Sequence, residues 1–168
     1  DENTTLPLSA RVDAPEVAPV PQHPDVAHWR AATLDDIDAI MVLTGAADAV
    51  DHPSWVTPRD DIESVLESSH IDLAADTLLG FAADGSLIAH GRATRAAAAD
   101  TRVQAYAMGT VHPDWRGRGI GRQLMAWSVA RAQQHLAASD SLLPGWVIMY
   151  AEETNTAAVR LGERAGLA

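Results

Sequence analysis

The sequence contains no cysteine and no lysine. The absence of cysteine excludes a disulfide framework, a thiol nucleophile and any cysteine-ligated zinc or iron–sulfur centre. No apolar run approaches the roughly 18 to 20 residues needed to cross a bilayer. No basic segment followed by an apolar one marks a secretory signal, so we expect a cytoplasmic protein. No pair of the seven histidines has a metal-ligand spacing such as H-E-x-x-H, and we predict no metal site.

Charge is distributed unevenly along the chain. The sequence carries 23 acidic residues against 12 arginines, a net charge of −11. Residues 1–100 hold 18 acids and 5 arginines, whereas residues 101–168 hold 5 acids and 7 arginines. The negative total argues against nucleic acid or an anionic membrane as a partner. The asymmetry predicts an anion-binding part beside a part that attracts cations.

The length of 168 residues and an apolar content of 47% fit one folded domain. Residues 1–25 combine five prolines with acidic and small residues and show no periodicity. We interpret this segment as a Pro-rich flexible arm, with a strap across a partner subunit as the alternative. The remaining residues, 26–168, carry the patterns of the folded domain. The chain begins at Asp1 rather than Met, from which we expect that an upstream piece has been removed.

Hydrophobic periodicity predicts an α+β sandwich with a central mixed sheet. Thr33 and Thr57 have the patterns of helix caps, and Asp84-Gly85 that of a hairpin turn. The expected strands cover residues 26–32, 77–83, 86–95, 102–112 and 146–151. The expected helices begin near residues 34 and 58, and two more cover residues 120–135 and 155–165.

A glycine-rich turn separates the fourth expected strand from the longest expected helix. Glycines at 117, 119 and 121 let ligand and backbone approach closely, and the amides that follow lie at a helix N-terminus, which favours anions. Arg116, Arg118 and Arg122 add positive charge, so we predict a phosphate or pyrophosphate site. The alternative is a structural turn with solvated arginines. No Lys-Ser/Thr follows the glycines, and they alternate strictly, which excludes Walker and Rossmann loops.

Two spaced motifs resemble the GNAT superfamily of acyl-CoA-dependent N-acyltransferases. Residues 116–121, Arg-Gly-Arg-Gly-Ile-Gly, match its R/Q-x-x-G-x-G/A signature, and Val111-x-Pro113 matches the end of its fourth strand. Downstream, residues 155–167 are similar to its closing helix, N-x-x-A-x-x-L-Y-E-x-x-G-F. The resemblance covers about residues 26–168 and implies a mixed central sheet flanked by helices.

The resemblance implies that acetyl-CoA is the cosubstrate and an amine the acceptor. The strand Met108 to Val111 would pair with the pantetheine arm, the amides of residues 116–121 would hold the pyrophosphate, and Asn155 would contact the pantetheine. The amine would attack the thioester directly in a ternary complex, with a strand N–H polarising the carbonyl. The cosubstrate-binding residues implied are Met108, Gly109, Thr110, Val111, Arg116, Gly117, Arg118, Gly119, Ile120, Gly121, Arg122 and Asn155.

The sequence departs from the family pattern at the expected catalytic groups. The family's general acid is a tyrosine in the closing helix, and the matching position here is Gly162. We therefore name Tyr150 as candidate acid and Glu152 as candidate base. The alternatives are a strand tyrosine packed against the core and a solvated acid. His52 could touch the substrate or be a solvated loop residue.

The family also continues past the closing helix with two further strands, whereas this sequence stops at Ala168. We expect a fragment, or a sheet completed by another segment. The alanine- and arginine-rich composition suggests a high-GC bacterial source, where tandem GNAT proteins of the mycothiol synthase type occur.

Two functions follow from this resemblance. The first is an N-acetyltransferase acting on a small cationic amine, attracted by the acidic first 100 residues. The alternative is a catalytically degenerate CoA-binding domain that supports a second acyltransferase domain. Its partner would be that second GNAT domain or a homodimer copy.

Overall fold

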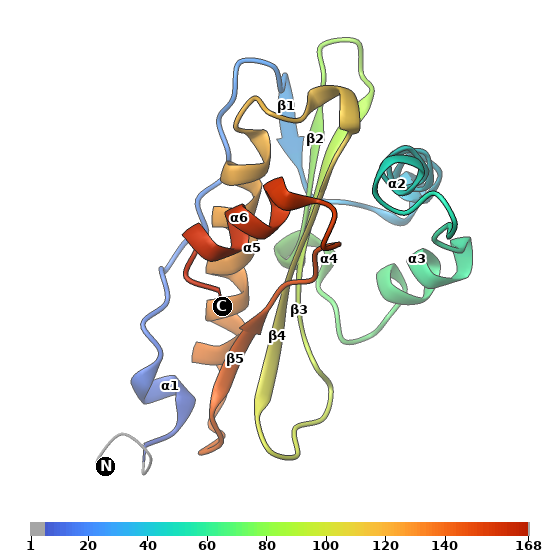
Figure 1. Ribbon diagram of the computed structural model, residues 1–168. Helices are drawn as coiled ribbons and strands as arrows, with labels where there is room; N and C mark the ends of the chain where they lie inside the picture. Colours follow the sequence, from blue (N-terminus) through green and yellow to red (C-terminus); the bar gives the residue numbers. More distant parts are fainter. Residues whose placement is uncertain (1–5, 168) are drawn as a thin grey trace.

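The computed structural model describes residues 6–167 and has a five-stranded sheet at its centre (Figure 1). The strands are β1 (His28–Arg30), β2 (Thr77–Phe81), β3 (Leu87–Arg95), β4 (Val103–Val111) and β5 (Gly145–Ile148). The helices are α1 (Leu8–Arg11), α2 (Ile37–Asp51), α3 (Arg59–Leu66), α4 (Leu73–Asp76), α5 (Ile120–Ala137) and α6 (Thr156–Arg164). The strands follow chain order across the sheet, antiparallel up to β4 and parallel between β4 and β5. The predicted mixed sheet flanked by helices is confirmed.

Helices cover both faces of this sheet (Figure 1). α5 packs on one face, where a methyl group on Gly91 of β3 would lie 2.7 Å from Leu124 Cδ1, so strand and helix touch. α2 packs on the opposite face, with Ile40 and Leu43 buried in a cluster with Leu79 of β2. Thr33 and Asp36 form the predicted capping box before α2, although the first turn, Leu34–Asp36, is 3₁₀.

The last two strands diverge. β4 pairs with β5 only from Val103–Gly145 to Tyr106–Ile148, whereas β4 itself continues to Val111. The fifth strand, expected over residues 146–151, begins one residue earlier than expected, at Gly145, and ends three residues earlier, at Ile148. Met149 to Ala151 leave the sheet and lead towards α6, so a gap in pairing opens beside the second half of β4.

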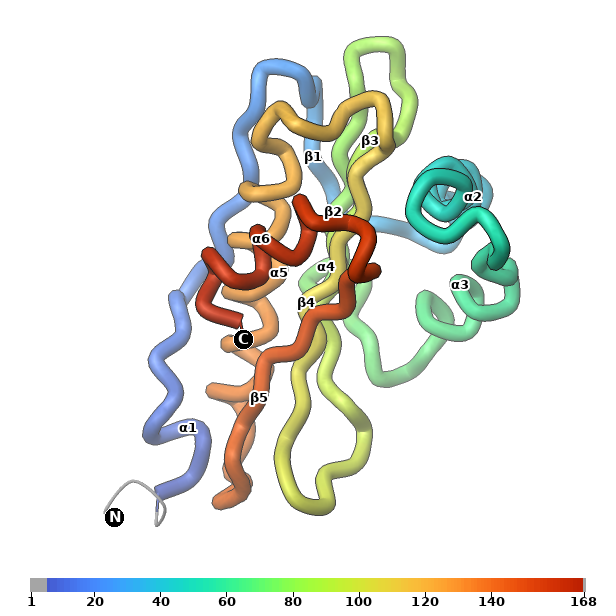
Figure 2. The backbone as a smooth tube through the Cα atoms, in the orientation of Figure 1, coloured from blue at the N-terminus to red at the C-terminus, as the bar shows by residue number. Residues whose placement is uncertain are grey.

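Residues 6–25, which we call the N-terminal segment, lie along α5 (Figure 2). The sequence predicted a flexible arm for this part of the chain. Leu8 is only 2% exposed, inside a cluster with Leu136 of α5. Arg11 donates hydrogen bonds to the carbonyls of Leu142 and Leu143 at 2.9 and 2.6 Å. These contacts join residues more than 130 positions apart, which composition cannot show. Residues 1–5 lie outside the described part, and the division at residue 25 stays a prediction.

Two smaller differences concern the helices. Pro58 rather than Thr57 is the N-cap of α3, which begins at Arg59, and the single turn α4 has no counterpart in the predicted order. None of the helices described between residues 6 and 167 is both long and apolar enough to cross a membrane.

Candidate active site

A cleft of about 870 Å³ lies where β4 and β5 diverge. Its walls come from the end of α2, the second half of β4, the glycine-rich turn, the start of α5, the segment after β5, and α6. The predicted site residues that line it are Met108, Gly109, Thr110, Val111, Arg116, Gly117, Gly119, Gly121, Arg122, Tyr150, Glu152 and Asn155. Arg118 and Ile120 do not line it, because Ile120 is a core residue and Arg118 contacts the N-terminal segment.

The edge of β4 presents backbone groups to this cleft. His112 N–H donates to Ile88 on the β3 side, whereas Val103 N–H donates to Pro144 on the β5 side. Backbone groups alternate between the two edges of a strand, so those of Gly109 and Val111 point to the β5 side. Because pairing with β5 stops at Tyr106, the N–H groups of Gly109 and Val111 face the cleft.

The glycine-rich turn directs the first amides of α5 into the same cleft. Gly117 and Gly119 have φ values of +77° and +91°, a conformation that favours glycine. Gly119 is the N-cap of α5, and the amides that follow have no partner within the helix. The cleft thus receives the positive end of an 18-residue helix.

Two of the three predicted loop arginines are paired within the protein. Arg116 donates two hydrogen bonds to the carboxylate of Asp51, at 2.7 and 2.9 Å, and a third to the carbonyl of Val111. Arg118 pairs with Asp25 at 3.2 Å and lies over the Trp115 ring. Arg122 is exposed, lines the cleft, and forms no ion pair within residues 6–167.

Sequence reasoning missed several residues of the cleft, among them Arg160, Arg164 and Asp51. Arg160 and Arg164 of α6 are exposed and line it, and their spacing of four places them on one helix face. That spacing is visible in the sequence and could have identified them. Asp51 was missed because its partner, Arg116, is 65 positions away.

The acidic residues that line the cleft differ in whether their carboxylates already have a partner within the protein. Asp51 is held by Arg116, and Asn155 Nδ2 lies 3.5 Å from the same carboxylate. Asp48 accepts from the Thr57 amide at 2.7 Å and pairs with His52 Nε2 at 3.1 Å. The carboxylate of Glu152 is exposed and forms no ion pair or hydrogen bond in the described part of the chain. Among the described acids that line this cleft, Glu152 is therefore the one whose carboxylate has no partner.

His52 is unsuited to act as a base. Its Nδ1 lies 2.9 Å from the carbonyl of Trp55, and its Nε2 faces Asp48. A carbonyl and a carboxylate only accept hydrogen bonds, so neither ring nitrogen of His52 faces a group from which it could take a proton. The hydrogen bond to the Trp55 carbonyl, followed by the charges of Asp48 and Glu152, raises the pKa of His52 above its usual value.

Tyr150 is 68% exposed and lies after the end of β5 rather than within a strand. Its ring stacks on Tyr106 with 6.2 Å between centroids. Gly162, by contrast, faces Met149, because a Cβ on Gly162 would lie 2.7 Å from the Met149 sulfur. The thioether of Met149 thus occupies the space beside the position where a tyrosine was expected.

The split between two parallel strands, with a helix N-terminus aimed into it, forms a cleft suited to an anionic ligand. The family model described as "Acetyltransferase (GNAT) domain" matches residues 75–166. The chain belongs to this GNAT acetyltransferase family. A search of the curated proteins found no match.

Solved structures with the same fold support the assignment. One is a GCN5-related N-acetyltransferase from Sphaerobacter thermophilus, with 26% identity and a TM-score of 0.61, covering 82% of this chain and 42% of that one. The present chain thus spans less than half of that protein's length. A ribosomal-protein-alanine N-acetyltransferase from Brucella melitensis has 19% identity, a TM-score of 0.60 and 83% coverage of both chains. A NatC complex bound to Gag peptide and CoA has 16% identity and a TM-score of 0.61, covering 82% of each chain; these last two show the fold alone.

Proposed function

We propose that this chain transfers an acetyl group from acetyl-CoA to the nitrogen of a small amine. The observation that carries the proposal is the cleft at the β4–β5 divergence, which combines a free strand edge with a helix N-terminus. Membership of the GNAT family supports acetyl transfer as the reaction class.

The cosubstrate would be bound by three groups of residues. The edge of β4 at Gly109 and Val111 would pair with the amides of the pantetheine arm, as an added strand would. The first amides of α5 would bind the pyrophosphate. The exposed arginines of the cleft would supply the positive charge that the phosphates require, and they are Arg122, Arg160 and Arg164.

The acetyl group would be transferred by direct attack of the amine on acetyl-CoA. The amine nitrogen attacks the thioester carbonyl, the carbon–sulfur bond breaks, and the acetyl group passes to nitrogen. The N–H of Gly109 would donate to the carbonyl oxygen as negative charge develops on it. Glu152 would take the proton that the ammonium loses, and the hydroxyl of Tyr150 would donate one to the leaving thiolate. Glu152 is favoured over Asp48 and Asp51 because those carboxylates are already paired.

A second candidate is a CoA-binding domain that has lost catalysis and supports another acyltransferase domain. Met149 beside Gly162 favours it, because the family's usual acid is absent and its space is filled.

The first experiment measures CoA binding by calorimetry and thiol release from acetyl-CoA with a panel of amines. Gly119→Pro should lower CoA affinity at least about 100-fold, because proline holds φ near −65° where the turn needs +91°. Gly45→Ala is the matched control, since that glycine has ordinary helical φ and open space beside it. Unchanged affinity in Gly119→Pro would contradict the placement.

Turnover separates the two candidates. If the chain releases thiol in the presence of an amine, the degenerate-domain alternative fails. Glu152→Gln and Tyr150→Phe should then each lower kcat by about 10² or more while CoA affinity is retained. A wild-type rate in either variant removes that residue from the mechanism. Binding of CoA without turnover across the panel would favour the degenerate domain.

A further inference from the structure

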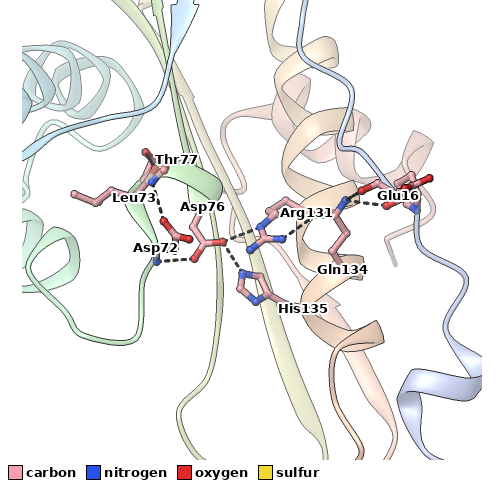
Figure 3. A network of polar contacts seen from close by, with 10 residues as sticks. Glu16, Asp72, Leu73, Asp76, Thr77, Arg131, Gln134 and His135 are labelled. Carbon is pink, nitrogen blue, oxygen red and sulfur yellow. Dashed lines mark hydrogen bonds and ion pairs between the residues drawn. The ribbon is translucent and has the colours of Figure 1, made fainter.

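Arg92 of β3 is an exception among the half-buried arginines of this protein. Six arginines in residues 6–167 are half-buried, and five of them have a partner. The partners are the carbonyls of Leu142 and Leu143 for Arg11, Asp36 for Arg30, the Trp146 ring for Arg102, Asp51 for Arg116 and Asp76 for Arg131 (Figure 3). Arg92 forms no hydrogen bond, ion pair or ring contact in this part of the chain, and its Nε is buried without a partner.

No acid among the described residues 6–167 forms an ion pair with Arg92 or raises its pKa. Its partners across the sheet are Thr77 on β2 and Met108 on β4. His90, two positions earlier on the same face, also has a buried, unpartnered nitrogen, Nε2. Burial lowers the pKa of Arg92, and for His90 burial and then the Arg92 charge lower the pKa to about 4. We call these two residues the basic strip.

The burial of Arg92 is costly in free energy, because its Nε has lost hydration and gained no hydrogen bond in return. The cost is conspicuous in a chain with 23 acidic residues and 12 arginines, where most half-buried arginines have found a partner. An anionic group from outside the described fold would remove the penalty. The strip therefore has the chemistry of an anion-binding site.

The basic strip adjoins the cleft. Met108 and Thr110, the β4 residues directly opposite Arg92 and His90, both line the cleft. Opposed residues of an antiparallel pair share one face of the sheet. Neighbouring strands lie about 4.8 Å apart, so Arg92 stands about one strand spacing from the wall along which the amine would react.

We propose that Arg92 binds the carboxylate of the acceptor, so that the acceptor is an amino acid-like amine carrying both an ammonium and a carboxylate. This inference rests on the proposed function and names its substrate class. The ammonium would lie towards Glu152 and the carboxylate over β3. A diamine would place a second positive charge against Arg92 and bind poorly.

The test titrates the protein, saturated with CoA, with glycine, β-alanine and γ-aminobutyrate, each paired with its amide, and with 1,3-diaminopropane. Wild type should bind at least one amino acid roughly tenfold or more tighter than its amide and than the diamine. Arg92→Gln should abolish that preference, and Arg92→Lys should keep part of it. The control is Arg95→Gln, an exposed arginine on the same strand, which should bind as wild type does.

Melting temperature without an acceptor provides a second readout. Arg92→Gln should melt higher than wild type, because the uncompensated charge is gone, whereas Arg95→Gln should not. An acceptor carboxylate should raise the melting temperature of wild type but not of Arg92→Gln.

The outcomes separate this inference from the proposed function. Preference for the carboxylate without thiol release would refute the enzyme and leave the Arg92 site standing. Thiol release with equal affinity for amino acids and amides, or a preference unchanged in Arg92→Gln, would overturn the inference alone. Failure of wild type to bind any member of the panel up to about 10 mM would also overturn it. A lower melting temperature in Arg92→Gln than in wild type would show that the charge of Arg92 is already compensated in the folded protein, and it would overturn the inference.

Discussion

Gly162 stands where the family motif has a tyrosine, and the side chain of Met149 lies directly beside it. Gly162 is a buried position on α6, and a methyl group there would approach the Met149 sulfur to 2.7 Å. The contact is tighter than real side chains allow, yet the neighbour is a flexible thioether that can move. The two positions should therefore be energetically coupled.

A double-mutant cycle tests that coupling. Gly162→Ala alone should gain little stability, because the helix propensity of alanine, worth about 1 kcal/mol, is offset by displacing Met149. In a Met149→Ala background the same change should stabilise the protein by about 1 kcal/mol. Urea unfolding measures both steps. Equal effects in the two backgrounds would show that the residues do not interact.

At the scale of whole elements, the N-terminal segment contacts the glycine-rich turn and holds it in place. His23 Nε2 lies 2.7 Å from the carbonyl of Arg118, and the amide of Gln22 donates to Gln123 Oε1 at 2.7 Å. Asp25 pairs with Arg118. Residues 22–25 thus brace the outer side of the turn, opposite the cleft-facing amides. Arg118 serves this contact, whereas the resemblance implied a phosphate ligand.

His23→Ala should weaken CoA binding by about 3- to 10-fold, since it removes a hydrogen bond worth about 1 kcal/mol to the turn. The melting temperature should change by only a few degrees. Calorimetry with CoA measures the affinity, and His70→Ala, an exposed loop variant, serves as its control. Full affinity in His23→Ala would mean that the turn holds its shape without this segment.

Across the whole molecule, acidic residues from the first part of the chain pair with arginines from the last part. The pairs Asp25–Arg118, Asp51–Arg116 and Asp76–Arg131 each join an acid from the first 100 residues to an arginine from the last 68. In the third pair, Asp76 is buried and also contacts His135 at 2.8 Å (Figure 3). The acidic part was expected to attract a cationic substrate, but two of the acids that line the cleft, Asp48 and Asp51, already contact basic side chains of the protein.

Global stability should depend on pH through His90. Its pKa of about 4 in the folded state lies below the value near 6.5 expected when unfolded. Between these values the unfolded chain binds a proton that the folded chain does not, so stability falls as pH falls from about 6.5 to about 4.

The expected loss between pH 7 and pH 4.5 is on the order of 2 kcal/mol, followed by urea unfolding. His90→Gln should flatten the profile in this window, whereas His70→Gln should keep the wild-type slope. A slope that His90→Gln leaves intact would assign the effect to other groups.

Local patterns were sufficient to predict most helices and strands and the shape of the glycine-rich turn. The capping box at Thr33, the Asp84-Gly85 hairpin and the glycines at 117 and 119 act over a few residues, so their signals are contiguous in the sequence. The second half of β4, the turn and Asn155, which family motifs mark in the sequence, all line the same cleft, and their contacts with a cosubstrate stay a prediction.

Charge partners and neighbours across the sheet required the folded chain. The sequence shows that Arg116, Arg118 and Arg92 are basic. It does not show that Asp51 and Asp25 pair with the first two, while Arg92 has no partner among residues 6–167. Whether a charge is available for a ligand depends on groups 65 to 93 positions away, and only tertiary contacts bring these together. The early end of β5 has the same origin: pairing with β4, rather than local propensity, decides where the strand stops and where the cleft opens.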